Sequence, residues 1–91
     1  MKHVRWNFEK AAWLKHERGL EFERIAVLIE ENQYIGIADV PSRIDQKMFI
    51  LDYDEYVVCV PFVENSEEVF LKTAYRNRKT NKRSKEDKNH E

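Results

Sequence analysis

The chain has 91 residues, of which 42% are hydrophobic and 36% charged, and its net charge is −1. This length fits one domain and leaves no room for two hydrophobic cores, while the aromatic content of 12% argues against a wholly disordered chain. The single cysteine, Cys59, excludes an intrachain disulfide framework and a cluster of cysteine ligands around a metal.

The cellular location follows from what the chain lacks. The first residues contain no apolar core of the kind that a signal peptide needs, and no apolar run is long enough to span a bilayer. We therefore expect a cytoplasmic protein without a membrane contact. Cys59 lies in the apolar run 56–60, where a free cysteine usually behaves as a small buried hydrophobic residue.

The net charge hides an asymmetry along the chain. Residues 1–71 hold 8 Lys and Arg against 14 Asp and Glu, a net charge of −6, whereas residues 72–91 hold 8 against 3, a net charge of +5. Basic segments of this kind attract phosphate backbones or acidic partners. The alternative is a solvated tail that only keeps the protein soluble, and charge alone does not separate the two.

The first helix is expected over residues 8–18, after a very short strand at 4–6. Asn7 is a suitable N-cap, and Gly19 stands where a left-handed backbone usually ends a helix. The apolar face of this helix is predicted to hold four residues, with Trp13 on its flank: Phe8, Ala11, Ala12 and Leu14.

A second helix is expected over about 21–31. Four apolar residues recur there at the spacing of one helical face, namely Phe22, Ile25, Ala26 and Ile29. Only a residue or two around Gly19 separates the helices, which predicts a tight corner or a helical hairpin.

From about residue 34 the apolar residues no longer follow a helical spacing and indicate strands instead. A strand is expected near 34–37, and a proline-containing loop follows it at 40–45. Three further strands, joined by turns at 54–55 and 64–67, are predicted at 47–53, 56–63 and 68–75. In the last of these, Phe70, Lys72 and Ala74 are expected to share one face. The predicted fold is α+β, with two N-terminal helices packed on a three- to four-stranded antiparallel sheet.

The sequence after Tyr75 contains no apolar residue. Such a segment cannot bury enough area to offset the entropy of ordering it. We therefore predict a folded domain over residues 1–79 and a flexible basic tail over 80–91.

Several kinds of chemistry have no support in the sequence. There is no glycine-rich phosphate loop, no His-Glu-x-x-His pair and no Gly-x-Ser-x-Gly motif. The three histidines are far apart along the chain, so no metal site and no cofactor are predicted.

Metal-free cleavage of RNA remains open. That reaction needs a base for a 2′-hydroxyl, cations for the charged phosphorane and a donor for the leaving oxygen. Cations and a phenolic donor occur together near the end of the last predicted strand: Lys72, Tyr75, Arg76, Arg78 and Lys79. The alternative for Lys72 is an ordinary outward-facing sheet residue.

A second basic cluster lies at the end of the first predicted helix, with Lys15, His16 and Arg18. These residues are candidates for substrate binding. The alternative is that they complement the helix dipole, as cations in a last turn commonly do.

Four short segments resemble the BrnT family of bacterial toxins: Trp-Asn-Phe-Glu-Lys at 6–10, Arg-Gly-Leu-Glu-Phe-Glu at 18–23, Phe-Leu-Lys-Thr at 70–73 and Arg-Lys-Thr at 78–80. The similarity runs from about residue 4 to residue 82. In that family the first helix usually ends in Lys-His-Gly, whereas this chain has Glu17, Arg18 and Gly19 there. The two basic positions of the closing family motif match Arg78 and Lys79.

The resemblance implies a small ribonuclease toxin of a type II toxin–antitoxin system, with a compact fold related to RelE. Arg78 and Lys79 carry over from the family, and the leading hypothesis is that they grip the phosphate together with Lys72 and Arg76. The resemblance also implies a small antitoxin partner, typically a ribbon-helix-helix DNA-binding protein. Tyr75 and the helix-end cluster would then contact the RNA.

Two other functions stay open on the sequence. One is a non-catalytic module that binds an antitoxin-like partner, and the other is nucleic-acid binding through the basic tail alone. The oligomeric state also stays open between a homodimer and a hetero-oligomer.

Overall fold

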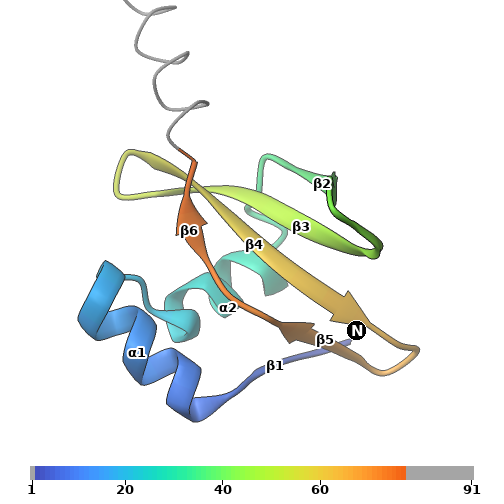
Figure 1. The fold of residues 1–91 in the computed structure, drawn as a ribbon, viewed down its shortest axis with the longest axis horizontal. Helices are drawn as coiled ribbons and strands as arrows, with labels where there is room; N and C mark the ends of the chain where they lie inside the picture. Colours follow the sequence, from blue (N-terminus) through green and yellow to red (C-terminus); the bar gives the residue numbers. More distant parts are fainter. Residues whose placement is uncertain (1, 78–91) are drawn as a thin grey trace, which may run out of the picture.

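The computed structural model describes residues 2–77, which form two helices and six strands. The expected tail over 80–91 and the predicted site residues Arg78 and Lys79 lie outside the described residues. In chain order the elements are β1 (His3–Trp6), α1 (Phe8–Arg18), α2 (Phe22–Glu30), β2 (Gly36–Val40), β3 (Arg43–Tyr53), β4 (Tyr56–Glu64), β5 (Glu68–Leu71) and β6 (Tyr75–Arg76), as Figure 1 shows.

The described strands form one mixed sheet. Its strand order is β1-β5-β4-β3-β2, and β6 also pairs with β4. β1 runs parallel to β5, while the remaining pairs are antiparallel. The prediction of a three- to four-stranded antiparallel sheet is therefore wrong, because the sheet has six strands and a parallel edge. The parallel pair joins residues more than 60 positions apart, which a local pattern does not reveal.

The ends of α1 agree with the prediction. The Asn7 side chain accepts a hydrogen bond from the backbone N–H of Lys10 at 3.0 Å, and Gly19 has the left-handed φ of 66°. The predicted apolar face is wrong in part, since Phe8 is 84% exposed and Ala12 is also exposed. Phe8 and Ala12 share one side of the helix by their spacing of four, and the helix turns its Leu14 side to the core instead.

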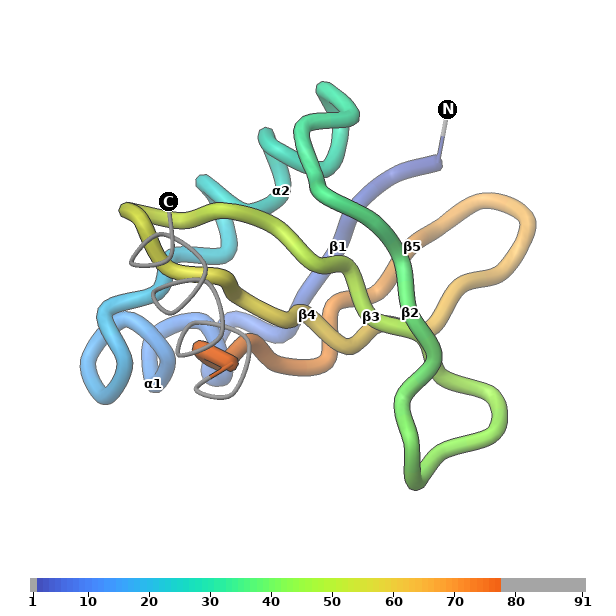
Figure 2. The backbone as a smooth tube through the Cα atoms, turned by 90° about the horizontal axis from the view of Figure 1, so that it is seen from above, coloured from blue at the N-terminus to red at the C-terminus, as the bar shows by residue number. Residues whose placement is uncertain are grey.

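The second helix agrees with its predicted apolar stripe. Its buried residues are Phe22, Ile25, Ala26 and Ile29. Together with Leu14 and Leu20 they pack on one face of the sheet, against residues of β3, β4 and β5. Figure 2 shows both helices beside the strands, with β2 and its loop to β3 at the far edge.

β4 is the central strand and is buried on both faces. Every residue from 57 to 62 is buried. Val58, Val60 and Phe62 belong to the helix-covered core, so the alternation of a strand turns Cys59 and its neighbours to the opposite face. The sequence expectation that Cys59 is buried is confirmed, because its side chain is 1% exposed.

The two-residue turn at 54–55 is also confirmed. Asp54 and Glu55 have left-handed φ values of 51° and 71°, which suits the twist of a two-residue hairpin. The expected loop at 40–45 is shorter than predicted, because β3 already begins at Arg43. The register with β2 is irregular at that end.

The strand predicted at 68–75 is interrupted. Leu71 pairs with Phe62, but Tyr75 pairs with Cys59, so four steps along this strand match three along β4. The extra residue makes a bulge, and a bulge reverses the facing of the residues that follow it. Ala74 consequently lies in the helix-covered core at 0% exposure, on the face opposite to Lys72, which corrects the expectation that the two share a face.

Candidate functional site

The end of α1 and the bulge between β5 and β6 are held together by two hydrogen bonds. The Arg18 guanidinium donates from Nη1 to the backbone carbonyl of Ala74 at 2.6 Å, and Arg76 donates from Nη1 to the backbone carbonyl of Arg18 at 2.7 Å. Arg18 also lies over the Trp13 ring, 4.8 Å from its centroid. We call the hydrogen bonds from Arg18 to Ala74 and from Arg76 to Arg18 the arginine bracket. They join residues that are separated in the sequence by 56 and 58 positions.

Arg18 and Arg76 were predicted to contact RNA, and the structure gives each of them a backbone carbonyl as partner. A guanidinium that donates to a carbonyl forms a charge-assisted hydrogen bond, which is stronger than a neutral one. The bracket therefore fixes the position of the bulge relative to α1.

The other two residues of the helix-end cluster point to solvent and pair locally. Lys15 Nζ lies 4.0 Å from Glu21 Oε1, and His16 Nε2 lies 3.9 Å from Glu17 Oε2. Their side chains are 71% and 80% exposed, respectively. Such contacts contribute little to stability, so both side chains are available to a ligand at the end of α1.

Lys72 and Tyr75 lie on the sheet face opposite the helices, which we call the open face. Lys72 follows the inward-facing Leu71, and its Nζ is 5.9 Å from the centroid of the Phe70 ring. Tyr75 pairs with Cys59 and so shares its face. No helix among residues 2–77 packs on this face, because the buried residues of both helices belong to the opposite core (Figure 1).

The Tyr75 side chain lies across the open face. Its hydroxyl donates a hydrogen bond to Met48 Sδ of β3 at 3.7 Å, and beyond it Asn77 donates from Nδ2 to Cys59 Sγ at 3.5 Å. Burial raises the pKa of the Tyr75 phenol, with a smaller contribution from Cys59. A raised pKa keeps the phenol protonated at neutral pH, so Tyr75 can donate a proton or a hydrogen bond but does not act as a base.

The charges of the described residues are divided between two regions. Residues 2–18, which form β1 and α1, hold 5 Lys and Arg against 2 acidic residues, while residues 19–71 hold 3 against 12. Lys72 and Arg76 extend the basic region at the bulge. Lys2 and Arg5 of this region already pair with Glu64 and Glu68, so a polyanion is attracted mainly to the cations of α1 and of the bulge and is repelled by most of the remaining body.

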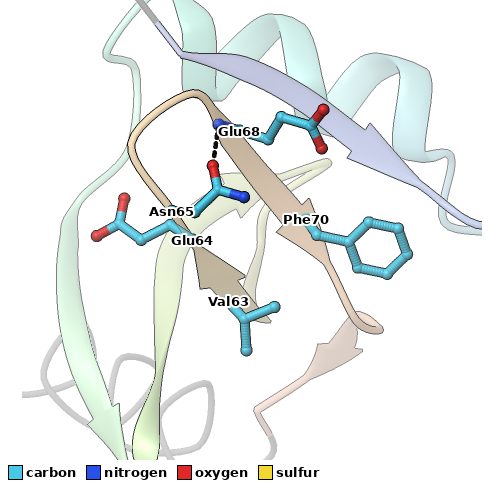
Figure 3. A pocket seen from close by; sticks show the side chains of 5 residues that line it. All are labelled: Val63, Glu64, Asn65, Glu68 and Phe70. Carbon is cyan, nitrogen blue, oxygen red and sulfur yellow. Dashed lines mark hydrogen bonds between the residues drawn. The ribbon is translucent and has the colours of Figure 1, made fainter.

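A hollow lies at the turn between β4 and β5 (Figure 3), away from the arginine bracket. It is lined by Val63, Glu64, Asn65, Glu68 and Phe70. Asn65 accepts hydrogen bonds from the backbone N–H groups of Glu67 and Glu68, both at 2.8 Å, and thereby shapes the turn. The Glu64 and Glu68 carboxylates of the hollow pair with Lys2 and Arg5, and the hollow itself is lined by no cation. We therefore interpret it as a structural feature of the turn.

The predicted site residues thus form two groups. Arg18 and Arg76 meet on the helix side, with Lys15 and His16 nearby along α1, whereas Lys72 and Tyr75 lie on the open face. Sequence reasoning missed the contribution of Phe70 and Asn77. The strand alternation that puts Phe70 on the same face as Lys72 was a signal for Phe70. The position of Asn77 depends on the bulge, which the sequence does not indicate.

Comparison with protein-family models, with curated proteins and with solved structures finds no match for this chain. Within residues 2–77 no group of three His, Cys, Asp or Glu side chains could hold a metal ion. Neither of the helices in that range is long and apolar enough to cross a membrane.

Proposed function

We propose that the protein is a cytoplasmic toxin of the BrnT type, the toxic component of a bacterial type II toxin–antitoxin system, and that it cleaves RNA without a metal. The observation that carries the proposal is the placement of Lys72 and Tyr75 on the open face, at a bulge held by the arginine bracket. In the sequence, Arg78 and Lys79 follow soon after this bulge, and they match the two basic positions of the closing family motif.

Each residue has a chemical role in this proposal. In metal-free RNA cleavage a 2′-hydroxyl loses its proton to solvent water as its oxygen attacks the adjacent phosphorus, the bond to the 5′-oxygen breaks, and a proton goes to that leaving oxygen. Lys72 neutralises charge that develops on the phosphorane. Tyr75, whose phenol is protonated at neutral pH, donates to a phosphate oxygen or to the leaving oxygen.

Arg18 and Arg76 act as positioning residues in this account. Their hydrogen bonds fix the bulge, and the bulge determines that Tyr75 and Lys72 lie on the same face. Phe70 offers a ring on that face on which an unpaired base can stack, an interaction worth about 1–3 kcal/mol per base.

The proposal is tested by induced expression in a bacterial host. Expression of the unaltered chain is expected to arrest growth and degrade RNA, and Lys72→Gln and Tyr75→Phe are expected to relieve both effects. Lys47→Gln is the matched control, because Lys47 is an exposed lysine on β3 outside the site. Harmless expression of the unaltered chain with intact RNA contradicts the proposal.

A second candidate function is a non-catalytic module that binds an antitoxin-like partner or nucleic acid. The arginine bracket favours it, because two of the predicted RNA contacts already have protein partners. This function predicts that the purified chain binds RNA with an affinity that falls steeply with salt but leaves the RNA uncut. Cleavage that Lys72→Gln abolishes would exclude it.

A further inference from the structure

Two exposed aromatic rings at one end of the molecule each lie against cations. Trp13 of α1 is 42% exposed, and the centroid of its ring is 4.4 Å from Lys10 Nζ and 4.8 Å from the guanidinium carbon of Arg18. Tyr56, at the start of β4, is 45% exposed, and the guanidinium carbon of Arg76 lies 5.1 Å from the centroid of its ring. Each ring therefore combines an exposed apolar surface with neighbouring positive charge.

The arginine bracket joins these two groups into one surface. Arg76 donates to the backbone carbonyl of Arg18, and Arg76 pairs with Val58 of the helix-covered core, so it lies on the side of the sheet that faces α1. Figure 2 shows α1, β6 and the turn between β3 and β4 at the same end of the molecule. We call this surface the cation–aromatic belt, and its members in spatial order are Lys10, Trp13, Arg18, Arg76 and Tyr56.

The arginines of the belt keep donors beyond those of the bracket. A guanidinium carries five N–H donors, and the bracket uses Nη1 of Arg18 and Nη1 of Arg76. Arg76 is exposed, so its remaining N–H groups can bind the oxygens of a phosphate in the forked geometry that suits this side chain. Glu17 lies four positions from Trp13 on the same side of α1 and opposes a phosphate there.

We propose that the cation–aromatic belt binds single-stranded RNA. Unpaired bases stack on the exposed surfaces of Trp13 and Tyr56, and phosphates pair with Lys10 and Arg76. Stacking on aromatic rings, with cations that follow the backbone, is a common way to hold a single strand. An acidic peptide would pair with the cations but would leave two flat rings without a stacking partner, which favours nucleic acid.

This inference deepens the proposed function and rests on it for the choice of RNA, but binding along the belt needs no cleavage. The probe is therefore a fluorescein-labelled 2′-O-methyl oligouridylate of about eight nucleotides. It lacks the 2′-hydroxyl that attacks phosphorus, so binding and cleavage can each fail alone. The full chain is expected to bind the same strand at least about tenfold more weakly once it is paired with its complement, because a duplex offers no unpaired base.

Variants of exposed residues on α1 and β4 test the belt without breaking the bracket. Trp13→Leu and Tyr56→Leu are each expected to weaken binding at least about fivefold through the loss of stacking. Phe8→Leu is the matched control, because Phe8 is 84% exposed but lies five positions from Trp13, on a different side of the helix, and should leave the affinity unchanged. Glu17→Gln is expected to tighten binding about twofold or more, since it removes a carboxylate beside Trp13.

The unaltered chain gives a readout that needs no variant in binding. The sequence holds two tryptophans, and in the isotope-labelled chain the indole N–H resonance of Trp13 is expected to shift on adding the strand. The resonance of Trp6, which packs against Phe22 at 5.9 Å between ring centroids, is expected to stay. The spectrum of Trp13→Leu assigns the two signals.

Four results would overturn the inference. They are no binding of the single strand at millimolar concentration, an affinity that both leucine variants leave unchanged, a shift of Trp6 without Trp13, and tighter binding of a hexaglutamate peptide than of the strand. The last result would assign the belt to an acidic protein partner. Cleavage of ordinary RNA by a chain whose belt variants bind the strand normally would contradict this inference while leaving the proposed function in place.

Discussion

Replacing Arg18 by methionine tests whether the arginine bracket holds the bulge. Methionine keeps the apolar stem but removes the donor to the Ala74 carbonyl, which is part-buried, and it removes the cation over Trp13. Loss of a hydrogen bond to a charged group costs about 1.5–3 kcal/mol, and loss of an exposed cation–π contact costs about 0.5–1 kcal/mol. We therefore expect the free energy of unfolding to fall by roughly 2–4 kcal/mol.

The assay is thermal and urea unfolding of the purified chain, followed by circular dichroism. For a domain of this size each kcal/mol lowers Tm by about 4–8 °C, so a decrease of roughly 10–30 °C is expected. Arg24→Met is the control, because Arg24 pairs through two hydrogen bonds with Asp54 on the surface and should change Tm much less. A Tm for Arg18→Met within about 3 °C of the unaltered chain, less than 1 kcal/mol, would refute the reasoning.

Three further predictions concern the ends of α1 and the open face. Asn7→Ala removes the N-cap hydrogen bond that the Lys10 N–H donates and should lower the free energy of unfolding in urea by about 1 kcal/mol. An unchanged urea midpoint would show that this cap does not stabilise the protein. Gly19→Ala should cost about 1 kcal/mol through its left-handed backbone alone, since no atom lies within 4 Å of the added Cβ, and a stabilised variant would contradict this. The raised pKa of Tyr75 contributes stability that is present below about pH 10 and is lost above it, as the unfolded phenol ionises first. The Tm of the unaltered chain should thus fall more steeply between pH 9 and pH 11 than that of Tyr75→Phe, and parallel curves would show that burial does not perturb this phenol.

The helices were predictable because their signals are local. Asn7, Gly19 and the stripe from Phe22 to Ile29 depend only on neighbouring residues, and the structure confirms each of them. The burial of Phe8 was predicted wrongly because the apolar residues of α1 fit more than one face of the helix. Which side faces the core depends on where the sheet lies.

The sheet was predicted less well because its pairing is not local. The pairing of β1 with β5 brings Val4 beside Val69, and no local sequence pattern near either residue indicates this pairing. The bulge after Leu71 has no local signal either, since Thr73 and Ala74 suit a regular strand. Its consequence for the site is large, because it places Tyr75 on the face of Lys72 and turns Arg76 to Arg18.

The basic character of the site was visible in the sequence, while the division of labour among its residues was not. Lys72 and Arg76 look alike as cations near a strand end. Only the three-dimensional register shows that Arg76 donates to the Arg18 carbonyl, whereas Lys72 lies on the open face beside Phe70. Long-range hydrogen bonds decide which cation positions the bulge and which is exposed to a ligand.

The central claim is that Lys72 and Tyr75 serve metal-free cleavage of RNA, and the most direct measurement is an end-labelled RNA incubated with the purified chain in excess chelator. The RNA is supplied both alone and on translating ribosomes, and a matched RNA carries one 2′-deoxy nucleotide at the cut position. The account predicts cleavage that leaves a 2′,3′-cyclic phosphate, persists in chelator, and is lost with the 2′-deoxy substitution and with Lys72→Gln. RNA that stays intact in both settings, or cleavage that chelator abolishes, would contradict it.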